Sequence, residues 1–301
     1  MSLRKLTYIA LLFVLGIFSA MSCGKDPEYG RGDYIYECDD LVEIDNVGGI
    51  LIRWADDIDI SDEQKYVIRN LVANMVRVEG GIFQMGAQHT DALGSNYDAE
   101  AQDDESPVHE VTLGNYYIGK YEITQQEWES VMGYDLEWSE TYGVGERLPA
   151  YNVSRADALR FVEKLSVIAG LHFQLPTEAQ WEFAARGGNR STQYRYSGSN
   201  DVDDVAWHKD NAQSMVHPVG AKLANELGLS DMSGNLWEWC LDAYGQYPEA
   251  TQTNPVVESG SQYVLRGGAW TYFPTCCRVT CRDRYNGNAR SVSNGFRVVM
   301  N

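Results

Sequence analysis

The spacing of apolar and polar residues predicts four helices, each opened by the same local signal. A hydroxyl residue is followed three positions later by a side chain that can return a hydrogen bond, which is the capping-box pattern. These boxes begin at Ser61, Thr124, Ser154 and Thr177. Apolar residues then recur at helical spacing, most clearly after Ser61 and Ser154. The third helix is predicted to end at Gly170, since glycine is common just after a helix C-terminus.

Short apolar runs between these helices predict strands. Residues 76–78 and 82–85 flank Gly80-Gly81, a pattern that predicts a β-hairpin, and residues 111–113 and 116–118 predict further strands. The polar and acidic residues 86–106 predict an exposed loop, and the chain after residue 189 is expected to consist mostly of turns and short strands. No repeat of 20–50 residues is visible. The pattern predicts an α+β domain with a few helices and much irregular chain.

The N-terminal residues 1–22 have the features of a lipoprotein-type signal peptide. Arg4 and Lys5 precede the apolar run 6–20, which is shorter than the ~20 residues that cross a bilayer. The run ends in Ala20-Met21-Ser22-Cys23, which resembles a lipobox and marks Cys23 as the lipidated residue of an exported, membrane-anchored protein of the cell envelope. Ordinary signal cleavage nearby and a buried N-terminal helix are the alternatives. Residues 23–60 are then predicted to be a tether with irregular or short-strand structure, followed by an amphipathic helix over 61–75.

The charge of the chain limits its partners. The formal net charge is −19, which argues against a nucleic-acid partner because such binding needs clustered Lys and Arg. An acidic balance of this kind is most simply a contribution to solubility.

The stretch 228–242, GLSDMSGNLWEWCLD, joins a turn to two tryptophans that bracket a carboxylate. Gly and Asn tolerate the backbone angles of a tight turn, so residues 230–235 are predicted to be a loop. Glu238 lies between Trp237 and Trp239, and a carboxylate among large aromatic side chains is costly unless it is satisfied. Glu238 is therefore expected to have a partner: backbone amides, an arginine or a cation.

This stretch resembles the GLYDMxGNVWEW motif of the formylglycine-generating enzyme family, the sulfatase-modifying factors. Further family landmarks follow in order: GGIFQMG at 80–86, PVHEVTL at 107–113, YEIT at 121–124, LPAYNVSRADA at 148–158, LPTEAQWEFAARGG at 175–188, RGGAW at 266–270 and GFR at 295–297. The resemblance covers residues 75 to 301 and implies a domain over 76–301. It also implies a C-type-lectin-like fold, with small antiparallel sheets and little regular secondary structure.

The resemblance implies a structural calcium ion in this turn. Carried onto this sequence, its ligands are Asp231, Gly234, Leu236 and Glu238, which are hard oxygen donors of the kind that Ca²⁺ prefers. The alternative is that Asp231 caps a turn while Glu238 pairs with an arginine. The family's second calcium would lie between residues 207 and 219, where Asn211 is the one convincing ligand.

The cysteines bear on catalysis. The resemblance implies that the oxidases of the family carry the pattern GGSxxC-x4-C. The thiolates of its two cysteines hold one Cu(I) ion. In this chain Ala269 replaces the serine and Tyr272 replaces the first cysteine. The second position falls at Cys277 when counted from Gly268 and near Pro274 when counted from the later arginines.

Cys276, Cys277 and Cys281 are thus weak catalytic candidates. Cys276 and Cys281 have the four-residue spacing but lie too late in the segment, so we attribute the spacing to chance and do not expect copper. The alternative for the cysteines is core packing with disulfides, for instance between Cys240 and one of these three.

Two functions are consistent with this sequence. The first is a binding or assembly lipoprotein that uses the old substrate cleft, with the aromatic residues Trp207, Trp270 and Tyr272, for a peptide, glycan or protein ligand. The second is a copper-dependent oxidase that converts a sulfatase cysteine to formylglycine. Six arginines lie in or near the motifs, and we interpret them as structural partners of carboxylates and carbonyls rather than as a substrate clamp. They are Arg186, Arg266, Arg278, Arg282, Arg284 and Arg297.

Overall fold

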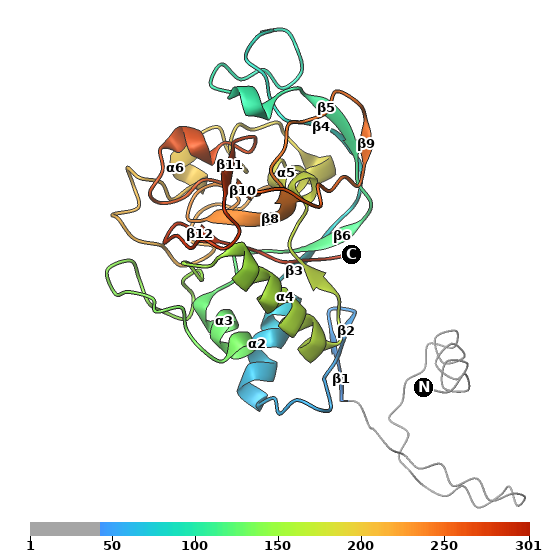
Figure 1. Cartoon of the computed structure of the whole chain (residues 1–301), viewed down its shortest axis with the longest axis vertical. Coiled ribbons are helices and arrows are strands. Elements are labelled where there is room, and N and C mark those ends of the chain that lie inside the picture. Colours follow the sequence, from blue (N-terminus) through green and yellow to red (C-terminus); the bar gives the residue numbers. More distant parts are fainter. Residues whose placement is uncertain (1–42) are drawn as a thin grey trace, which may run out of the picture. The chain divides into compact units, whose positions relative to one another are not determined.

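The structure is a computed structural model that describes residues 43–301 as one compact unit. The predicted signal peptide, the predicted lipidation site Cys23 and most of the predicted tether lie outside the described residues. Within residues 43–301 no helix is both long and apolar enough to span a membrane. Figure 1 shows three helices gathered at one end of this unit, next to the N-terminal hairpin, with most of the sheet structure at the other end.

The four predicted helices are present, and each capping box is confirmed. They are α2 (Asp62–Ala73), α3 (Gln125–Met132), α4 (Arg155–Ala169) and α5 (Glu178–Ala185). In each one the cap hydroxyl accepts a hydrogen bond from the third residue of the helix, and that residue's side chain returns one. Helix α4 is followed by Gly170 in the left-handed conformation, as predicted. A short α6 (Val202–Val205) and three 3₁₀ turns, η1 (Asp103–Glu105), η2 (Gly188–Arg190) and η3 (Pro274–Cys277), complete the helical elements of the described residues.

The strands form small sheets. An N-terminal hairpin pairs β1 (Ile44–Val47) with β2 (Ile50–Arg53), inside the segment expected to hold a tether followed by irregular or short-strand structure. One four-stranded sheet has the order β11-β10-β8-β12, from Arg282–Tyr285, Tyr263–Arg266, Trp237–Ala243 and Asn294–Gly295. The second has the order β3-β6-β13-β7, from Met75–Val78, Tyr116–Gly119, Val299–Met300 and Phe173–Gln174. The third is β4-β5-β9, from Ile82–Met85, His109–Thr112 and Gln252–Thr253. The α+β prediction is confirmed.

The predicted hairpin around Gly80-Gly81 is wrong, although both of its strands exist. β3 pairs with β6, whereas β4 pairs with β5, so the two strands belong to different sheets. The chain crosses between the sheets at Gly80, whose N–H donates to the Asn115 side chain at 2.9 Å. A Cβ at Gly80 would lie 2.3 Å from the Leu113 carbonyl oxygen. The glycines therefore allow a close crossing of two chain segments and do not form a two-residue turn.

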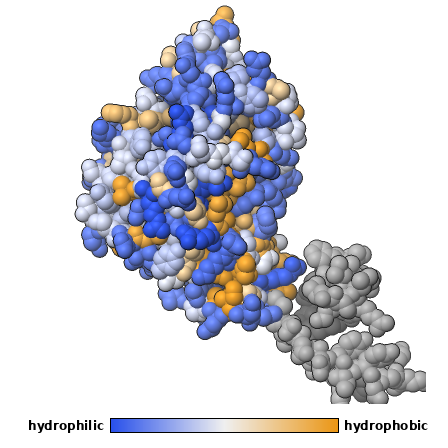
Figure 2. All heavy atoms as spheres, viewed as in Figure 1, coloured by the Kyte–Doolittle hydropathy of each residue, from blue (hydrophilic) through white to orange (hydrophobic). Residues whose placement is uncertain are grey.

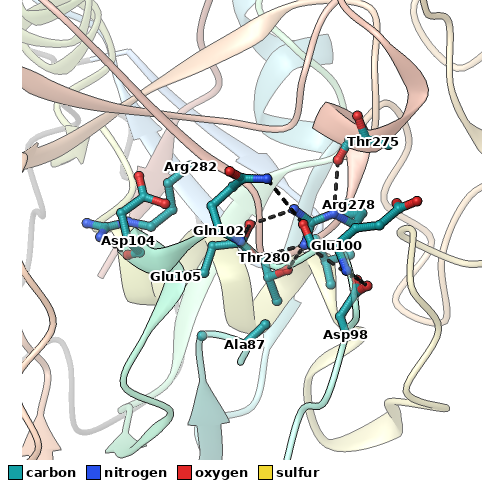
Figure 3. A network of polar contacts seen from close by, with 12 residues as sticks. Ala87, Asp98, Glu100, Gln102, Asp104, Glu105, Thr275, Arg278, Thr280 and Arg282 are labelled. Atoms are coloured by element: carbon teal, nitrogen blue, oxygen red, sulfur yellow. Dashed lines mark hydrogen bonds and ion pairs between the residues drawn. The ribbon is translucent and has the colours of Figure 1, made fainter. Parts of the chain in front are cut away.

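The loop over residues 86–106 is exposed only in part. Glu105 is fully buried, and Arg278 donates to its two carboxylate oxygens at 2.8 and 2.6 Å. The same guanidinium donates to the Thr280 hydroxyl and the Thr275 carbonyl (Figure 3). The exposed-loop prediction missed this anchor because the partner of Glu105 lies 173 residues away in the sequence.

Five of the six arginines that we interpreted as structural partners pair with carboxylates. Arg284 differs, because it is exposed and lies over the Tyr244 ring, 4.5 Å from its centre. Arg282 donates to both oxygens of Glu178, at 2.6 and 2.9 Å, and Arg266 pairs with Glu182 and Glu178. Other N–H groups of the two guanidiniums reach backbone carbonyls, including those of Asp104, Gly245 and Thr280, whereas the Arg266 Nε is buried without a partner. Multiple hydrogen bonds to each buried guanidinium offset the cost of removing it from water.

The pair between Arg297 and Glu238 joins the two four-stranded sheets. Arg297 lies between β12 and β13, which belong to different sheets, and Glu238 lies in β8. The guanidinium Nε and Nη2 atoms donate to the two Glu238 oxygens at 2.7 and 2.6 Å. Its other N–H groups reach the carbonyls of Gly119 and Ser230, both at 3.0 Å. Both side chains are fully buried.

We expect Arg297→Met to lower the free energy of unfolding by about 3–5 kcal/mol, because it leaves the Glu238 carboxylate buried and unpaired. The double variant Glu238→Gln/Arg297→Met should recover part of this loss, since neither partner is then charged. The control is Arg77→Met, which removes an exposed arginine paired with Glu79 and should cost at most about 1 kcal/mol. Urea unfolding measures all three. A loss below about 1 kcal/mol for Arg297→Met would contradict the assigned role of the pair.

Candidate functional site: the tryptophan turn and the cysteine face

Residues 230–235 form the predicted turn, and its backbone uses the left-handed region three times. Asp231, Gly234 and Asn235 have φ values of 59°, 78° and 61°. Gly234 also meets Trp207 closely, because a Cβ there would lie 2.4 Å from the Trp207 carbonyl oxygen. The Asn235 N–H donates to that carbonyl at 2.8 Å, and the Gly234 N–H donates to Gly267 at 2.8 Å. The turn is thereby held against the segment that begins the cysteine region.

Glu238 has an arginine partner, which was one of the alternatives left open by the sequence. In addition to the two bonds from Arg297, its Oε2 atom accepts a hydrogen bond from the Trp181 indole at 2.8 Å. Trp181 comes from α5, so helix, strand and C-terminal segment meet at one carboxylate. The Glu238 carboxylate therefore receives three N–H donors.

Two further acids lie beside this pair. Asp231 accepts a hydrogen bond from the Gly220 N–H at 2.7 Å, but its Oδ1 atom is buried without a partner. Burial raises the pKa of Asp231 to about 6. Sequence reasoning missed Glu122, which accepts hydrogen bonds from the Leu236 N–H at 2.9 Å and the Asn235 side chain at 2.7 Å. Burial, together with the charges of Asp231 and Glu238, raises the pKa of Glu122 well above its usual range. Glu122 belongs to the YEIT motif, which was its one sequence signal.

A calcium ion at this turn would compete with contacts that are already made, because Glu238 would have to release Arg297 and Trp181 before it bound a metal ion. Asp231 fits better, since its buried Oδ1 lacks a partner. The excess negative charge of Asp231 and Glu122 is what a cation or a proton would balance. Asn211 uses its side chain within its own loop, bonding Ala206, Asp203 and His208.

Calcium at this turn stays a prediction, and thermal unfolding tests it. A bound ion adds stability by mass action, so a chelator should lower the thermal midpoint of metal-loaded protein by several degrees. Asp231→Asn removes the charged candidate ligand, and that variant should lose the chelator-dependent shift. An unchanged midpoint in protein shown to contain calcium beforehand would assign charge neutralisation to Arg297 and to protons.

The three aromatic residues predicted to line a cleft have different environments. Trp270 is only 5% exposed, and its indole donates to the Val292 carbonyl, so its assignment to an exposed cleft is wrong. Trp207 is half-buried and stacks on His217, with a ring separation of 3.7 Å. Tyr272 is 37% exposed, and its ring meets the edge of Trp237 at 5.4 Å. Tyr272 alone among the three is an exposed aromatic side chain.

Tyr272 belongs to a surface that sequence reasoning did not find. Phe273 is 59% exposed and Tyr285 is 43% exposed, and the Lys209 ammonium lies 4.3 Å from the centre of the Phe273 ring. Asp283, Cys276 and Tyr285 lie close enough to Tyr272 to act on its ionisation, and its pKa is raised, mainly by burial. We call Tyr272, Phe273, Cys276, Asp283 and Tyr285 the cysteine face. Figure 2 shows hydrophobic residues as small groups among hydrophilic ones on the side of the domain it presents.

The four described cysteines are free thiols, so the alternative of a disulfide between Cys240 and one of the other three is wrong. Cys240 lies in a core cluster with Trp181 and Val264, whereas Cys276 and Cys281 belong to a different cluster. Cys277 is fully buried against Gly268, where an added Cβ would lie 2.8 Å from its sulfur. Burial raises the pKa of Cys277 far above the ordinary range. Cys276 thus packs against the cluster that contains Cys281, whereas Cys277 belongs to another cluster.

The known proteins to which this sequence is similar are described as a chaperone, as an enzyme and as an inactive enzyme. Residues 62–301 match the Sulfatase-modifying factor enzyme 1-like domain. The chain is 29% identical to "Chaperone protein LppX" of Paenibacillus barcinonensis, over 75% of this chain and 89% of that protein. It is 26% identical to "Formylglycine-generating enzyme" of Thermomonospora curvata, over 76% and 94% of the two chains. It is 27% identical to "Inactive C-alpha-formylglycine-generating enzyme 2" of Bos taurus, over 74% and 87%.

Comparison with solved structures agrees with the sequence match. The "Treponema denticola variable protein 1" superposes with a TM-score of 0.65 and 27% identity, over 86% of this chain and 98% of that one. The family match includes the tryptophan turn, the buried arginine pairs and the segment that carries the cysteine face. The chain therefore belongs to the sulfatase-modifying factor (formylglycine-generating enzyme-like) family.

Proposed function

We propose that this protein is an exported, lipid-anchored member of the family that binds a protein partner and has no copper oxidase activity. The observation that carries the proposal is Tyr272. Tyr272 occupies the position at which the resemblance places the first cysteine of the family oxidases. Its side chain is exposed, next to the exposed ring of Phe273. The position therefore presents an aromatic contact surface in place of a thiolate.

The chemistry of the neighbouring groups supports the loss of oxidase activity. A linear Cu(I) site needs two soft thiolates, and the phenol of Tyr272 is a hard ligand whose raised pKa keeps it protonated at neutral pH. Cys277, one of the two alignments of the second cysteine, is buried with a strongly raised pKa. Ala269 is also fully buried and supplies no hydroxyl where the family pattern has serine. This combination favours binding over oxidation.

A peptide segment of a protein partner is the ligand class that fits the cysteine face best. Exposed aromatic side chains give large contact areas with little loss of conformational entropy, and they are frequent in the energetically dominant part of interfaces. Lys209, next to Phe273, adds a cation that suits an acidic or carbonyl-rich segment. The relative described as a chaperone supports a protein partner over a glycan. Cys23 would tether this surface to the envelope.

The alternative function, a copper-dependent oxidase, requires two cysteine thiolates at the Cu(I) site. We expect no aldehyde when the protein is incubated with a cysteine-containing sulfatase peptide, air and copper, because either alignment fills at most one of the two family thiolate positions. Hydrazide labelling of the peptide, followed by mass spectrometry, measures the aldehyde. A catalytically active family oxidase is the positive control. Aldehyde formation that is abolished by Cys276→Ser or Cys281→Ser would overturn the proposal in favour of the oxidase.

Partner binding is tested by changing the aromatic surface alone. Against an array of random peptides, Tyr272→Ser and Phe273→Ser should each weaken binding about tenfold, which corresponds to ~1.4 kcal/mol. Tyr66→Ser is the matched control, since Tyr66 is 60% exposed on α2, outside the cysteine face, and should leave binding unchanged. Fluorescence anisotropy with the best peptides gives the affinities. Equal affinities for all four proteins would remove the cysteine face as the ligand site.

A further inference from the structure

A polar pocket of about 490 Å³ lies between the segment 86–106 and the residues 193–200 that follow α5. Its volume is within the range of ~300–1,000 Å³ that is typical of small-molecule sites. No residue of the cysteine face lines this pocket. Amide, guanidinium, carboxylate and tyrosine side chains line it, and those that decide its chemistry are Asn96, Tyr97, Asp98, Arg186, Tyr194 and Arg195.

Hydrogen bonds within the protein hold the two walls of the pocket in place. Asn96 has a left-handed backbone, with a φ of 51°, and its Nδ2 atom donates to two backbone carbonyls at the end of β4, at 2.7 and 2.8 Å. Asp98 joins the walls, because it accepts hydrogen bonds from Nε and Nη2 of Arg195 at 3.2 and 2.9 Å. Asp98 also lies beside Arg278 (Figure 3). The pocket is therefore formed without a ligand, which lowers the ordering cost of binding.

Three side chains of the pocket keep unused hydrogen-bonding groups. The Nε and Nη2 atoms of Arg186 and Arg195 donate to protein oxygens, whereas their Nη1 atoms have no partner within residues 43–301. The Nδ2 atom of Asn96 makes two bonds, and its Oδ1 atom accepts none from the described part of the chain. The pocket therefore presents two donors and one acceptor to a ligand.

The charges around the pocket are balanced. Arg186 pairs with Glu182, and Arg195 pairs with Asp98 and Glu100. An anionic ligand would meet guanidiniums that already have carboxylate partners, and it would approach the Asp98 carboxylate in the same pocket. A neutral ligand with hydroxyl groups avoids this repulsion, and each hydroxyl can both donate and accept a hydrogen bond.

A tyrosine ring stands on each wall of the pocket. Tyr97 is 43% exposed and Tyr194 is 37% exposed. An exposed tyrosine combines an apolar ring face with a polar hydroxyl. The C–H groups of a sugar ring can pack on such a face while the sugar hydroxyls reach the polar groups nearby. The two tyrosines therefore favour a cyclic polyol over a linear one.

We propose that this pocket binds a neutral saccharide. The sugar hydroxyls bond the Nη1 atoms of Arg186 and Arg195 and the Oδ1 atom of Asn96, and the sugar ring packs against Tyr97 or Tyr194. The unused donors and acceptor, together with the balanced charge, carry this inference. Saccharide binding here is separate from peptide binding at the cysteine face and does not depend on it.

Saturation-transfer difference NMR on the full-length protein tests the proposal. The neutral probes are glucose, galactose, mannose and N-acetylglucosamine, and glucuronate is the acidic probe. We expect saturation transfer to at least one neutral sugar and weaker transfer to glucuronate. Tyr97→Ala and Tyr194→Ala should each weaken binding of that sugar about tenfold, because each removes an aromatic face. Tyr194→Phe keeps the ring and should retain the affinity.

Two further variants are controls. Tyr66→Ala removes an exposed tyrosine on α2, outside the pocket, and should leave sugar binding unchanged. Tyr272→Ser alters the cysteine face and should also leave it unchanged, so the two sites can fail separately.

Four outcomes would overturn the proposal. The first two are an absence of transfer to all four neutral sugars and sugar binding that survives both alanine substitutions in the pocket. Stronger transfer to glucuronate than to any neutral sugar would replace the neutral class with an acidic one. A loss of sugar binding in Tyr272→Ser equal to that in Tyr194→Ala would place the sugar at the cysteine face.

Discussion

The buried ion pair between Arg297 and Glu238 connects the two four-stranded sheets to each other. Glu238 is in β8, and Arg297 occupies the short link by which the chain leaves one sheet at β12 and enters the other at β13. The pair also receives the Trp181 indole from α5 and reaches the carbonyl of Ser230 at the start of the tryptophan turn. With sheets of so few residues, backbone pairing alone joins little of the domain. The ion pair therefore fixes where the turn, and the segment beyond it, lie.

Other buried arginines also connect parts of the fold that are distant in sequence. The chain carries 43 acidic and 24 basic residues, yet the fully buried guanidiniums of Arg266, Arg278 and Arg297 act as internal cross-links. Each reaches carboxylates and backbone carbonyls that are distant in sequence. Irregular chain has many carbonyls that no sheet or helix satisfies, and a planar five-donor side chain can satisfy several at once. Most buried acids of the described residues pair with an arginine, whereas Glu122, Asp231 and Asp242 are buried and form no ion pair there.

Local signals predicted the helices well because a capping box is complete within four residues. The α+β class and the structural role of the arginines also followed from the sequence. The pairing of β3 and β4 did not, since Gly80 resembles a turn residue whether the chain reverses or passes close to Leu113. The partner of Glu238 was predicted only as a set of alternatives. Choosing among them required Arg297 to be placed by the whole sheet arrangement.

The sequence motifs also did not predict which residues of the cysteine face are exposed. Trp270 and Tyr272 are two residues apart in one motif. The Trp270 indole is nevertheless buried and donates to the Val292 carbonyl, whereas the Tyr272 side chain is exposed. Likewise Cys276 and Cys277 are adjacent, and the 3₁₀ turn presents one to solvent and the other to Gly268. Motif spacing locates such a segment but does not say which side of a tight turn each residue occupies.

The anchor formed by Glu105 and Arg278 has a consequence for how this domain can diversify. The long segment between β4 and β5 meets the core through this pair at its far end and through Asp98, which pairs with Arg278 and Arg195. Much of the chain before Asp98 is polar and exposed. Its length and composition can therefore change between residues 89 and 95 with little effect on core packing, provided that Asp98 and Glu105 are kept. Such a segment gives the fold a region in which new surface properties can be acquired while the sheets and the tryptophan turn remain the same.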